Sequence, residues 1–315
     1  MRNVLVTVSS FSERCVSACK LLRDKQFNLI FRNSVDHLIQ SGSPSSGCSV
    51  HAVIAGKDSY DAGTLALLPE LKILSRFGTD VDNIDIEAAR KAGIVVNHAP
   101  GINASSVAEF IMGLIFSGLR NIPGNDRDMQ NGYRGYSLGS ELNNKRIGLL
   151  GFGNIAKTLV KRLSGFETEI LAFDNNPDYR ESAKLGVKFV SVDDIFMQSN
   201  IIVVLLPYAP ALENFISHKY LSMMRNGALL INTARGKLLD ETALLQVIDE
   251  RNIFAALDVF SQEPLPPFSP LLHSRNIITT PHIAAETVES YHNTGIYTAR
   301  SIIDFFDGKT VKNCL

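Results

Sequence analysis

The sequence has 315 residues, of which 45% are hydrophobic, and a formal net charge of −1 at pH 7. This apolar content is ample for buried cores and excludes a disordered chain. The near-zero charge excludes long-range attraction to nucleic acid or anionic lipid. The sequence has no run of about 20 uncharged apolar residues, so no membrane span is expected. The length predicts about two domains.

Short apolar runs alternate with segments of helical period along most of the chain. The apolar N-terminal run predicts a buried strand rather than a secretion signal, because no small-residue cleavage pattern follows it. Continuous aliphatic runs such as Ile201–Leu205 are typical of parallel strands buried on both faces. The expected strands are Val4–Val8, Ala52–Ile54, Lys72–Ser75, Ile94–Val96, Arg146–Leu150, Ile170–Phe173, Ile201–Leu205, Ala228–Ile231, Ala255–Leu257 and Ile277–Thr279.

A domain boundary is expected at Asn97–Gly101, where proline and glycine end a strand. Ser106–Glu109 then has a capping-box pattern that predicts the start of a long apolar helix. The last helix, Glu286–Phe306, is expected to return to the first unit. A cleft between two such domains is a common place for a substrate. The expected division is a substrate-binding domain of residues 1–98 and 287–315 and a nucleotide-binding domain of residues 99–286.

The segment Gly151–Ala156 has the pattern G-x-G-x-x-A between a predicted strand and a predicted helix. In a dinucleotide-binding turn, Gly151 permits the tight turn and Gly153 lets the backbone approach the pyrophosphate. Ala156 is small enough for close packing of helix on strand. The helix N-terminus then offers unpaired N–H groups to the phosphates.

The next predicted strand ends in Asp174, 18 residues beyond Ala156. A carboxylate there can accept both ribose hydroxyls and would repel a 2′-phosphate. The alternative for Asp174 alone is a turn or a helix cap. The complete order of strand, glycines, helix, strand and aspartate predicts an NAD site. Asn175 and Asn176 follow in place of arginines, which favours NAD over NADP.

Three polar residues each follow a predicted strand of the nucleotide-binding domain: Arg235, Glu263 and His282. Such strand ends line the ligand crevice of open α/β sheets. Oxidation of a 2-hydroxy acid needs a base for the hydroxyl proton, and the imidazole of His282 suits this task. The reaction also needs a cation for the carboxylate, and the planar guanidinium of Arg235 matches it. Glu263 would orient the histidine.

Each of these residues has a structural alternative when it is taken alone. A histidine after proline is often only a loop residue, an Arg-Gly pair is often a surface turn, and Glu-Pro often ends an element. The conjunction of all three at strand ends favours catalysis. The interpretation therefore depends on the set rather than on any one residue.

Several longer motifs carry a family resemblance. They are Ser75–Asp85, the glycine-rich turn, Asn232–Gly236, Asp258–Phe260 with Glu263-Pro264, and Thr280–His282. Through them the chain resembles the D-isomer-specific 2-hydroxyacid dehydrogenase family, particularly its phosphoglycerate dehydrogenase-like branch. This resemblance implies a Rossmann dinucleotide-binding domain inserted into a smaller flavodoxin-like α/β substrate domain. It also implies a homodimer built through the nucleotide-binding domain.

The resemblance also implies residue roles. Arg235 would bind the substrate carboxylate and carbonyl, His282 would be the acid/base, and Glu263 its partner. Asp174 would lie at the ribose and Asp258 at the nicotinamide amide. The remaining residues expected at the cofactor are Gly151, Gly153, Asn154, Ile155, Pro207, Thr233, Ala234 and Ala284. Those expected at the substrate are Lys57, Arg76, Phe77, Gly78 and Thr79.

The chain departs from the family pattern in two places. Asp80 stands where glycine is usual in the substrate loop, and Lys57 stands near the position of an arginine in relatives that use phosphoglycerate. No regulatory domain is expected after Leu315. The leading hypothesis is a 3-phosphoglycerate dehydrogenase-like enzyme, with a glyoxylate or hydroxypyruvate reductase as the alternative. An NAD(H)-sensing binding protein is the alternative from another class, and the intact catalytic set disfavours it.

The cysteines, Cys15, Cys19, Cys48 and Cys314, match no zinc-site spacing. Unpaired small residues in a reducing compartment are expected, which favours the cytoplasm. The aspartates at positions 80, 82 and 85 miss the calcium-loop pattern, because Ile84 fills a ligand position. Capping and turn roles are expected for them, and no metal site is expected.

Overall fold

The computed structural model describes residues 1–32, 34, 35, 49–133 and 135–315. The chain forms two compact units. Unit 1 comprises Met1–Asn103 and Glu286–Leu315, and unit 2 comprises Ala104–Ala285. Among the described residues, no helix has both the length and the apolar character needed to cross a membrane.

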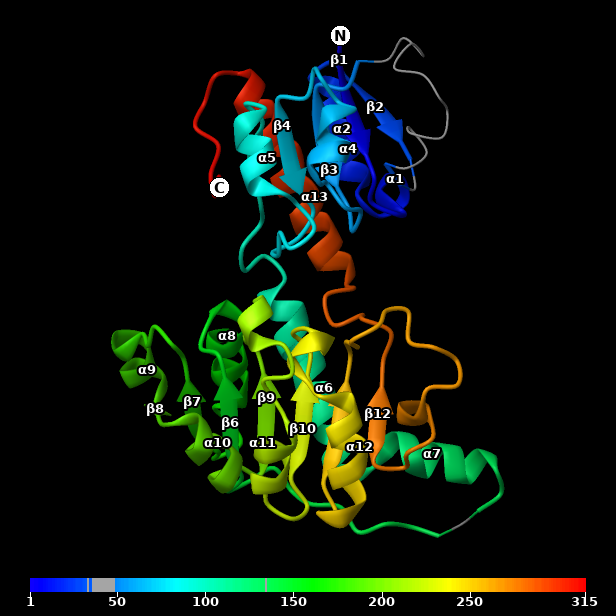
Figure 1. Ribbon diagram of the computed structural model, residues 1–315, viewed down its shortest axis with the longest axis vertical. Helices are drawn as coiled ribbons and strands as arrows, with labels where there is room; N and C mark the ends of the chain where they lie inside the picture. Colours follow the sequence, from blue (N-terminus) through cyan, green and yellow to red (C-terminus); the bar gives the residue numbers. More distant parts are fainter. Residues whose placement is uncertain (33, 36–48, 134) are drawn as a thin grey trace. The chain divides into compact units, whose positions relative to one another are not determined.

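Unit 1 is built on a five-stranded parallel sheet in the order β2-β1-β3-β4-β5, the flavodoxin-like order. Figure 1 shows this sheet with its helices. Its strands are β1 Arg2–Val6, β2 Phe27–Phe31, β3 Ala52–Ala55, β4 Ile73–Arg76 and β5 Val95–Asn97. Its helices are α1 Phe11–Arg14, α2 Val16–Asp24, α4 Ala62–Ala66, α5 Ile86–Lys91 and α13 Val288–Phe306.

The two faces of this sheet are covered by different helices because side chains alternate along each strand. In β1, Val4 and Val6 pack with α1, α2 and α13, whereas Leu5 packs with α4 and α5. The long C-terminal helix α13 thus completes the core of the N-terminal unit. The sequence predicted this return.

Unit 2 is built on a seven-stranded parallel sheet in the order β12-β11-β10-β9-β6-β7-β8. Successive strands are added in one direction from β6 to β8 and in the other direction from β9 to β12, so the strand order switches between β6 and β9, as in the Rossmann fold. The strands are β6 Arg146–Leu150, β7 Glu169–Phe173, β8 Val187–Phe189, β9 Ile201–Val204, β10 Leu229–Asn232, β11 Phe254–Leu257 and β12 Ile277–Thr279. The helices are α6 Ala104–Arg120, α7 Ile122–Gln130, α8 Asn154–Leu163, α9 Tyr179–Leu185, α10 Val192–Gln198, α11 His218–Met223 and α12 Glu241–Glu250, with the 3-10 turns η1 Pro210–Leu212, η2 Gly236–Leu238 and η3 Pro270–Leu272.

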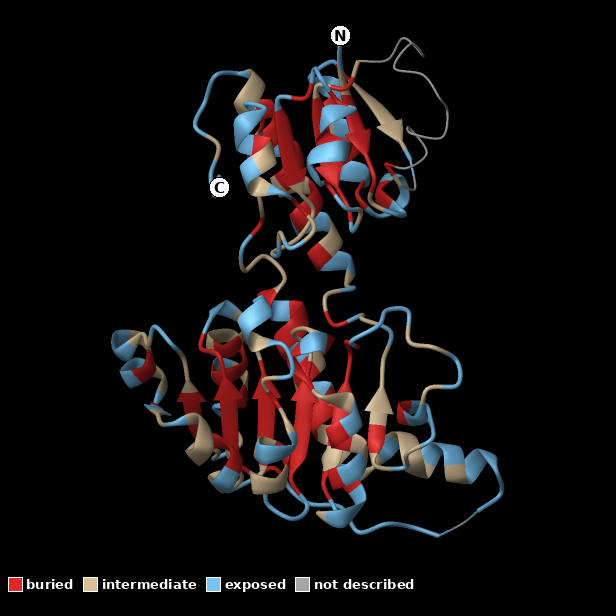
Figure 2. Cartoon of the chain, viewed as in Figure 1, coloured by how far each residue is buried: buried red, intermediate tan, exposed pale blue. Residues whose placement is uncertain are grey.

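The central strands of unit 2 are buried on both faces (Figure 2). In β9, Ile202 and Val204 pack with α10, α11 and α12, whereas Ile201 and Val203 pack with α6 and α8. The predicted fold class, a Rossmann domain within a flavodoxin-like α/β unit, is confirmed. The continuous aliphatic runs were a reliable signal for these strands.

Some predicted details were wrong. The helix α6 begins at Ala104, so Ser106 lies buried inside the helix and is no cap. Glu109 instead pairs with Arg162 of α8. The strands β2 and β8 were not predicted, and β1 ends at Val6 rather than Val8.

The division between the units falls at 103/104 and 285/286, a few residues from the expected positions. At the first crossing, the chain just after β5 is still bonded to unit 1. His98 N donates to Asn313 O at 3.3 Å, and Ala99 N donates to Gly78 O at 2.9 Å. Both residues therefore belong structurally to unit 1.

Candidate active site

The glycine-rich turn follows β6 as the sequence predicted. Gly151 has a φ of +104°, and a side chain there would meet Leu205 O at 2.8 Å. Glycine is required for both reasons. The helix α8 begins directly after Gly153, where an added Cβ would meet nothing within 4 Å. The backbone there is open for the close approach of a phosphate group.

Asp174 directly follows β7 and braces this turn. Its Oδ2 accepts a hydrogen bond from Phe152 N at 2.7 Å, and its Oδ1 accepts one from Asn176 N at 2.8 Å. The carboxylate is therefore fixed beside the glycine turn, with acceptor capacity left on each oxygen. The turn-forming role that was the alternative for Asp174 is present, and it is compatible with a ribose contact.

Asn154 and Ile155 form the first turn of α8, and Pro207 is exposed in the loop after β9. Thr233 directly follows β10, and its hydroxyl is buried with no hydrogen-bond partner in the described part of the chain. A buried hydroxyl without a partner costs free energy, and a bound molecule can supply the missing partner. Ala234 adjoins it in the same loop.

The backbone of the loop that carries Arg235 is fixed by hydrogen bonds from the last residue of β10. Asn232, the fully buried last residue of β10, accepts from Ala234 N at 3.1 Å and donates to Arg235 O at 3.0 Å. Arg235 Nη1 donates to Ala234 O at 2.8 Å. Asn232 thus fixes the backbone on which the partly buried guanidinium stands.

Glu263 and His282 form a direct pair between the loops that follow β11 and β12. Glu263 Oε2 lies 2.7 Å from His282 Nδ1, and Glu263 Oε1 accepts from Phe260 N at 3.1 Å. Both side chains are about one-third exposed, so the pair is accessible. With Nδ1 facing the carboxylate, the other ring nitrogen of His282, Nε2, is left to exchange a proton.

Asp258 is fully buried and ties the loop of His282 to the sheet. Its Oδ1 accepts from Thr280 Oγ1 at 2.6 Å and from Ile283 N at 2.9 Å, while its Oδ2 accepts from Ala284 N at 2.9 Å. These donors flank His282 on both sides in sequence. Asp258 is therefore a positioning residue, a role that the sequence did not predict.

The loops of Arg235 and Glu263 approach each other at Gly236. An added Cβ on Gly236 would lie 1.8 Å from the carbonyl carbon of Phe260. Only glycine permits this approach. Since Phe260 N also donates to Glu263, one backbone contact joins the two loops. The sequence had no signal for this contact, because it lies between loops distant in the chain.

The expected substrate loop belongs to unit 1 and follows β4. Arg76 Nη1 donates to Phe77 O, and to Ala55 O at 3.4 Å, so its guanidinium folds onto the loop backbone. The ring of Phe77 packs on Phe11, with centroids 5.7 Å apart. Both side chains thereby fix the loop, and Gly78 with a φ of +149° gives it its turn.

Thr79 lies at the end of this loop, and Lys57 lies in the loop after β3. Thr79 Oγ1 donates to Asn103 Oδ1 at 3.2 Å, and His98 Nδ1 lies 2.6 Å from Thr79 O. Lys57 is exposed, and the described structure gives no hydrogen bond or ion pair for its ammonium group. The region around the aspartates at 80, 82 and 85 holds no metal-binding cluster within the described ranges, and Asp85 caps α5 by accepting from Ala88 N.

Unit 2 has the fold and the turn of a dinucleotide-binding domain, and residues 112–284 match the family described as D-isomer specific 2-hydroxyacid dehydrogenase, NAD binding domain. The chain belongs to this family, and its cofactor is NAD(H). It is 36% identical over 266 residues to a D-3-phosphoglycerate dehydrogenase of Archaeoglobus fulgidus, a match that covers 84% of this chain and 50% of the relative.

A glyoxylate reductase of Thermofilum pendens is 37% identical over 260 residues, with 80% of this chain and 77% of the relative covered. The chain spans about half the length of the phosphoglycerate dehydrogenases that it matches. Among solved structures, the TT0316 protein of Thermus thermophilus superposes with a TM-score of 0.88 at 25% identity and covers 99% of both chains.

Proposed function

We propose that this protein is an NAD-dependent dehydrogenase that interconverts a small D-2-hydroxy acid and its 2-oxo acid. The observation that carries the proposal is the pairing of His282 with Glu263, 2.7 Å apart, at the same sheet edge as Arg235. The strands β10, β11 and β12 are neighbours and parallel, so the loops after them share one edge. The dehydrogenases among its relatives support the same reaction class.

In the proposed mechanism the nicotinamide supplies hydride chemistry at C2 of the acid. Arg235 binds the carboxylate through two parallel N–H donors and fixes the orientation of C2. In reduction, His282 Nε2 gives a proton to the carbonyl oxygen as it becomes a hydroxyl. In oxidation the same nitrogen takes that proton, and Glu263 stabilises the imidazolium that forms.

We propose the cofactor contacts from the match between these residues and the parts of a dinucleotide. Gly153 and the N-terminus of α8 would hold the pyrophosphate, and Asp174 the ribose. The buried hydroxyl of Thr233, which has no hydrogen-bond partner among the described residues, would gain one from the bound cofactor. Asp258 would serve the nicotinamide end, since it already fixes Ala284 by a hydrogen bond.

For the substrate we propose 3-phosphoglycerate or a close relative, with Lys57 and the backbone of the loop after β4 as contacts. The phosphoglycerate dehydrogenases among the relatives support this assignment. The alternative is reduction of glyoxylate or hydroxypyruvate. It is favoured by the glyoxylate reductase match and by Lys57, because an ammonium group is a flexible point charge and binds a phosphate less specifically than a guanidinium group does.

To test these assignments, NADH oxidation is measured with each of three substrates: 3-phosphohydroxypyruvate, hydroxypyruvate and glyoxylate. A kcat/KM at least tenfold higher for the phosphorylated acid supports the first assignment, and a Lys57→Ala variant should remove that preference. A preference for glyoxylate or hydroxypyruvate supports the alternative. Tight NADH binding without turnover of any 2-oxo acid would contradict the dehydrogenase proposal and favour an NAD(H) sensor.

We also propose a homodimer formed through unit 2. The helix α7 projects beyond the sheet of that unit (Figure 1). This helix and residues 131–133 and 135–138 expose several large apolar side chains. The exposed fractions are 64% for Met129, 62% for Tyr133, 86% for Tyr136 and 92% for Leu138. Several exposed large apolar side chains so close in sequence are unusual on a free surface, and an interface with a second copy of the chain would cover them. Light scattering gives the molar mass of the parent protein and of a Leu138→Asp variant. The proposal predicts a dimeric parent protein and a weakened dimer in the variant, and a monomeric parent protein would contradict it.

The proposed compartment is the cytoplasm. Cys15 and Cys19 lie about one helical turn apart, and neither forms a disulfide bond. Cys314 is also free, while Cys48 lies outside the described residues. Free thiols are usual in reducing compartments. Cell fractionation tests this assignment.

A further inference from the structure

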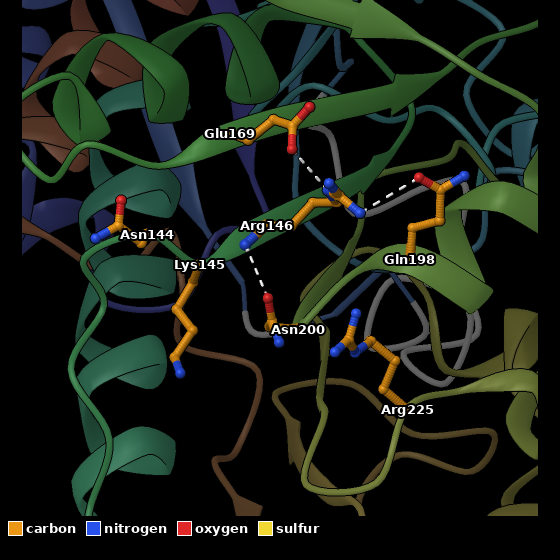
Figure 3. Close-up of a pocket in the computed structure, with 7 residues that line it drawn as sticks. All are labelled: Asn144, Lys145, Arg146, Glu169, Gln198, Asn200 and Arg225. Carbon is orange, nitrogen blue, oxygen red and sulfur yellow. Dashed lines mark hydrogen bonds and ion pairs between the residues drawn. The ribbon is translucent and has the colours of Figure 1, made fainter.

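A polar hollow with a volume of about 310 Å³ lies at the edge of the unit 2 sheet where the strands begin, opposite the edge that carries Arg235, Glu263 and His282. Figure 3 shows the residues that line it. Arg146 is the first residue of β6, Glu169 is the first residue of β7, and Asn200 directly precedes β9. The glycine turn follows the other end of β6, roughly 15 Å away along a five-residue strand. The hollow is therefore separate from the cofactor site.

Three cations and one carboxylate line this hollow. The carboxylate, Glu169, is already neutralised: its Oε2 lies 2.7 Å from Arg146 Nε, and its Oε1 lies 2.9 Å from Lys188 Nζ. Hydrogen bonds from Lys188 and then Arg146 hold the pKa of this carboxyl below its usual value. Arg146 is further fixed by Gln198 Oε1 at 3.3 Å. This ion pair therefore forms one wall of the hollow.

The other two cations, Lys145 and Arg225, are not compensated in this way. The described part of the chain gives neither side chain an ion pair or a hydrogen bond, although both line the same hollow. Gathering like charges around one hollow costs free energy unless an anion is present. Asn200 adds an amide donor, because its Oδ1 is occupied by Arg146 N at 2.9 Å and its Nδ2 is left for a ligand.

We infer that this hollow binds a small anion with at least two negative charges, held by Lys145, Arg225 and Asn200. The volume is at the lower end of the range for small-ligand sites, about 300–1,000 Å³. A phosphate ester and a polycarboxylate both satisfy this chemistry. Charge-assisted hydrogen bonds from an ammonium and a guanidinium group supply the affinity.

The test is calorimetric titration of the NADH-saturated protein with pyrophosphate and, separately, with citrate at low ionic strength. NADH occupies the glycine turn, so binding there does not contribute. We expect saturable binding of at least one anion, and the tighter one identifies phosphoryl or carboxylate oxygens as the preferred acceptors. A Lys145→Ala/Arg225→Ala variant should bind it at least about tenfold more weakly.

The matched control is Lys161→Ala/Arg275→Ala, which removes the same two charge types from exposed positions outside the hollow. It should bind the anion as the parent protein does. Absence of binding overturns the inference, as does equal affinity in the Lys145/Arg225 variant, which would place the anion elsewhere, for example at Arg235. Equal weakening in the control also overturns it, because it indicates attraction by net charge alone. Binding is the readout, so the proposed dehydrogenase activity is tested separately.

Discussion

His282 Nδ1 lies 2.7 Å from Glu263 Oε2, although the two residues stand on loops that follow different strands. The pair is maintained from both sides: Phe260 N holds the second oxygen of Glu263, and Asp258 holds the backbone after His282. This arrangement holds Nδ1 against the carboxylate, so Nε2 is the ring nitrogen that we propose faces the substrate.

A Glu263→Gln variant should reduce kcat for 2-oxo acid reduction by about 10- to 100-fold. The amide lacks the charge that stabilises the imidazolium, while its size preserves the packing. Steady-state NADH oxidation measures the effect, and the NADH dissociation constant serves as the control. A kcat within twofold of the parent value would show that the carboxylate is dispensable.

An Arg235→Lys variant should reduce kcat/KM by about 100-fold, with much of the loss in KM. Lysine keeps the charge but cannot bind a carboxylate bidentately. The backbone contact of Asn232 with residue 235 is unaffected, so the loop should keep its shape. Equal KM values for the 2-oxo acid in both proteins would contradict the assigned role.

Replacing Asp258 by asparagine should lower the free energy of unfolding by about 2 kcal/mol or more. The buried carboxylate accepts three hydrogen bonds, and an amide nitrogen in place of one oxygen would face a donor. Urea denaturation of the full chain, analysed for the unfolding transition of unit 2, measures this loss. If stability were unchanged, the network around His282 would not depend on the charge of Asp258.

A Gly236→Ala variant should separate the loops of Arg235 and Glu263. The new methyl group would overlap Phe260, and the backbone must move because the clash is with main-chain atoms. We expect at least tenfold lower kcat/KM, with NADH affinity less affected. As a comparison, Gly186→Ala changes a glycine whose Cβ position is open, although its φ of +69° makes this variant slightly destabilised. Equal activity of the two variants would count against the loop contact.

An Asp174→Asn variant should narrow the preference for NADH over NADPH. Removing the negative charge removes the repulsion of a 2′-phosphate, and the hydrogen bonds to Phe152 N and Asn176 N remain possible through one amide oxygen at a time. The ratio of kcat/KM values for the two cofactors should fall about tenfold. A constant ratio would mean that Asp174 only braces the turn.

The sequence predicted the central strands of the sheets better than the edge strands β2 and β8. Strands such as Ile201–Val204 are continuous aliphatic runs, because both faces of a parallel sheet are buried. The edge strands β2 and β8 were missed because polar residues, Asn28 and Lys188, interrupt their apolar pattern. Their identity depends on pairing with a neighbouring strand, which a local pattern does not contain.

The same distinction applies to the site. Arg235, Glu263 and His282 were predicted because chain order and strand ends indicate one sheet edge. The roles of Asn232 and Gly236 were not, because they arise from contacts between loops that are distant in the chain. A capping-box pattern was likewise insufficient to locate the start of α6.

The most direct test of the mechanism uses a His282→Ala variant with NADH already bound. A 2-oxo acid that the parent protein reduces is added, and stopped-flow absorbance gives the rate of NADH oxidation. We expect a normal NADH dissociation constant and a rate of NADH oxidation at least about 100-fold lower, because the general acid is lost. A correctly folded variant that oxidises NADH at the parent rate would contradict the assignment of His282 as the proton donor.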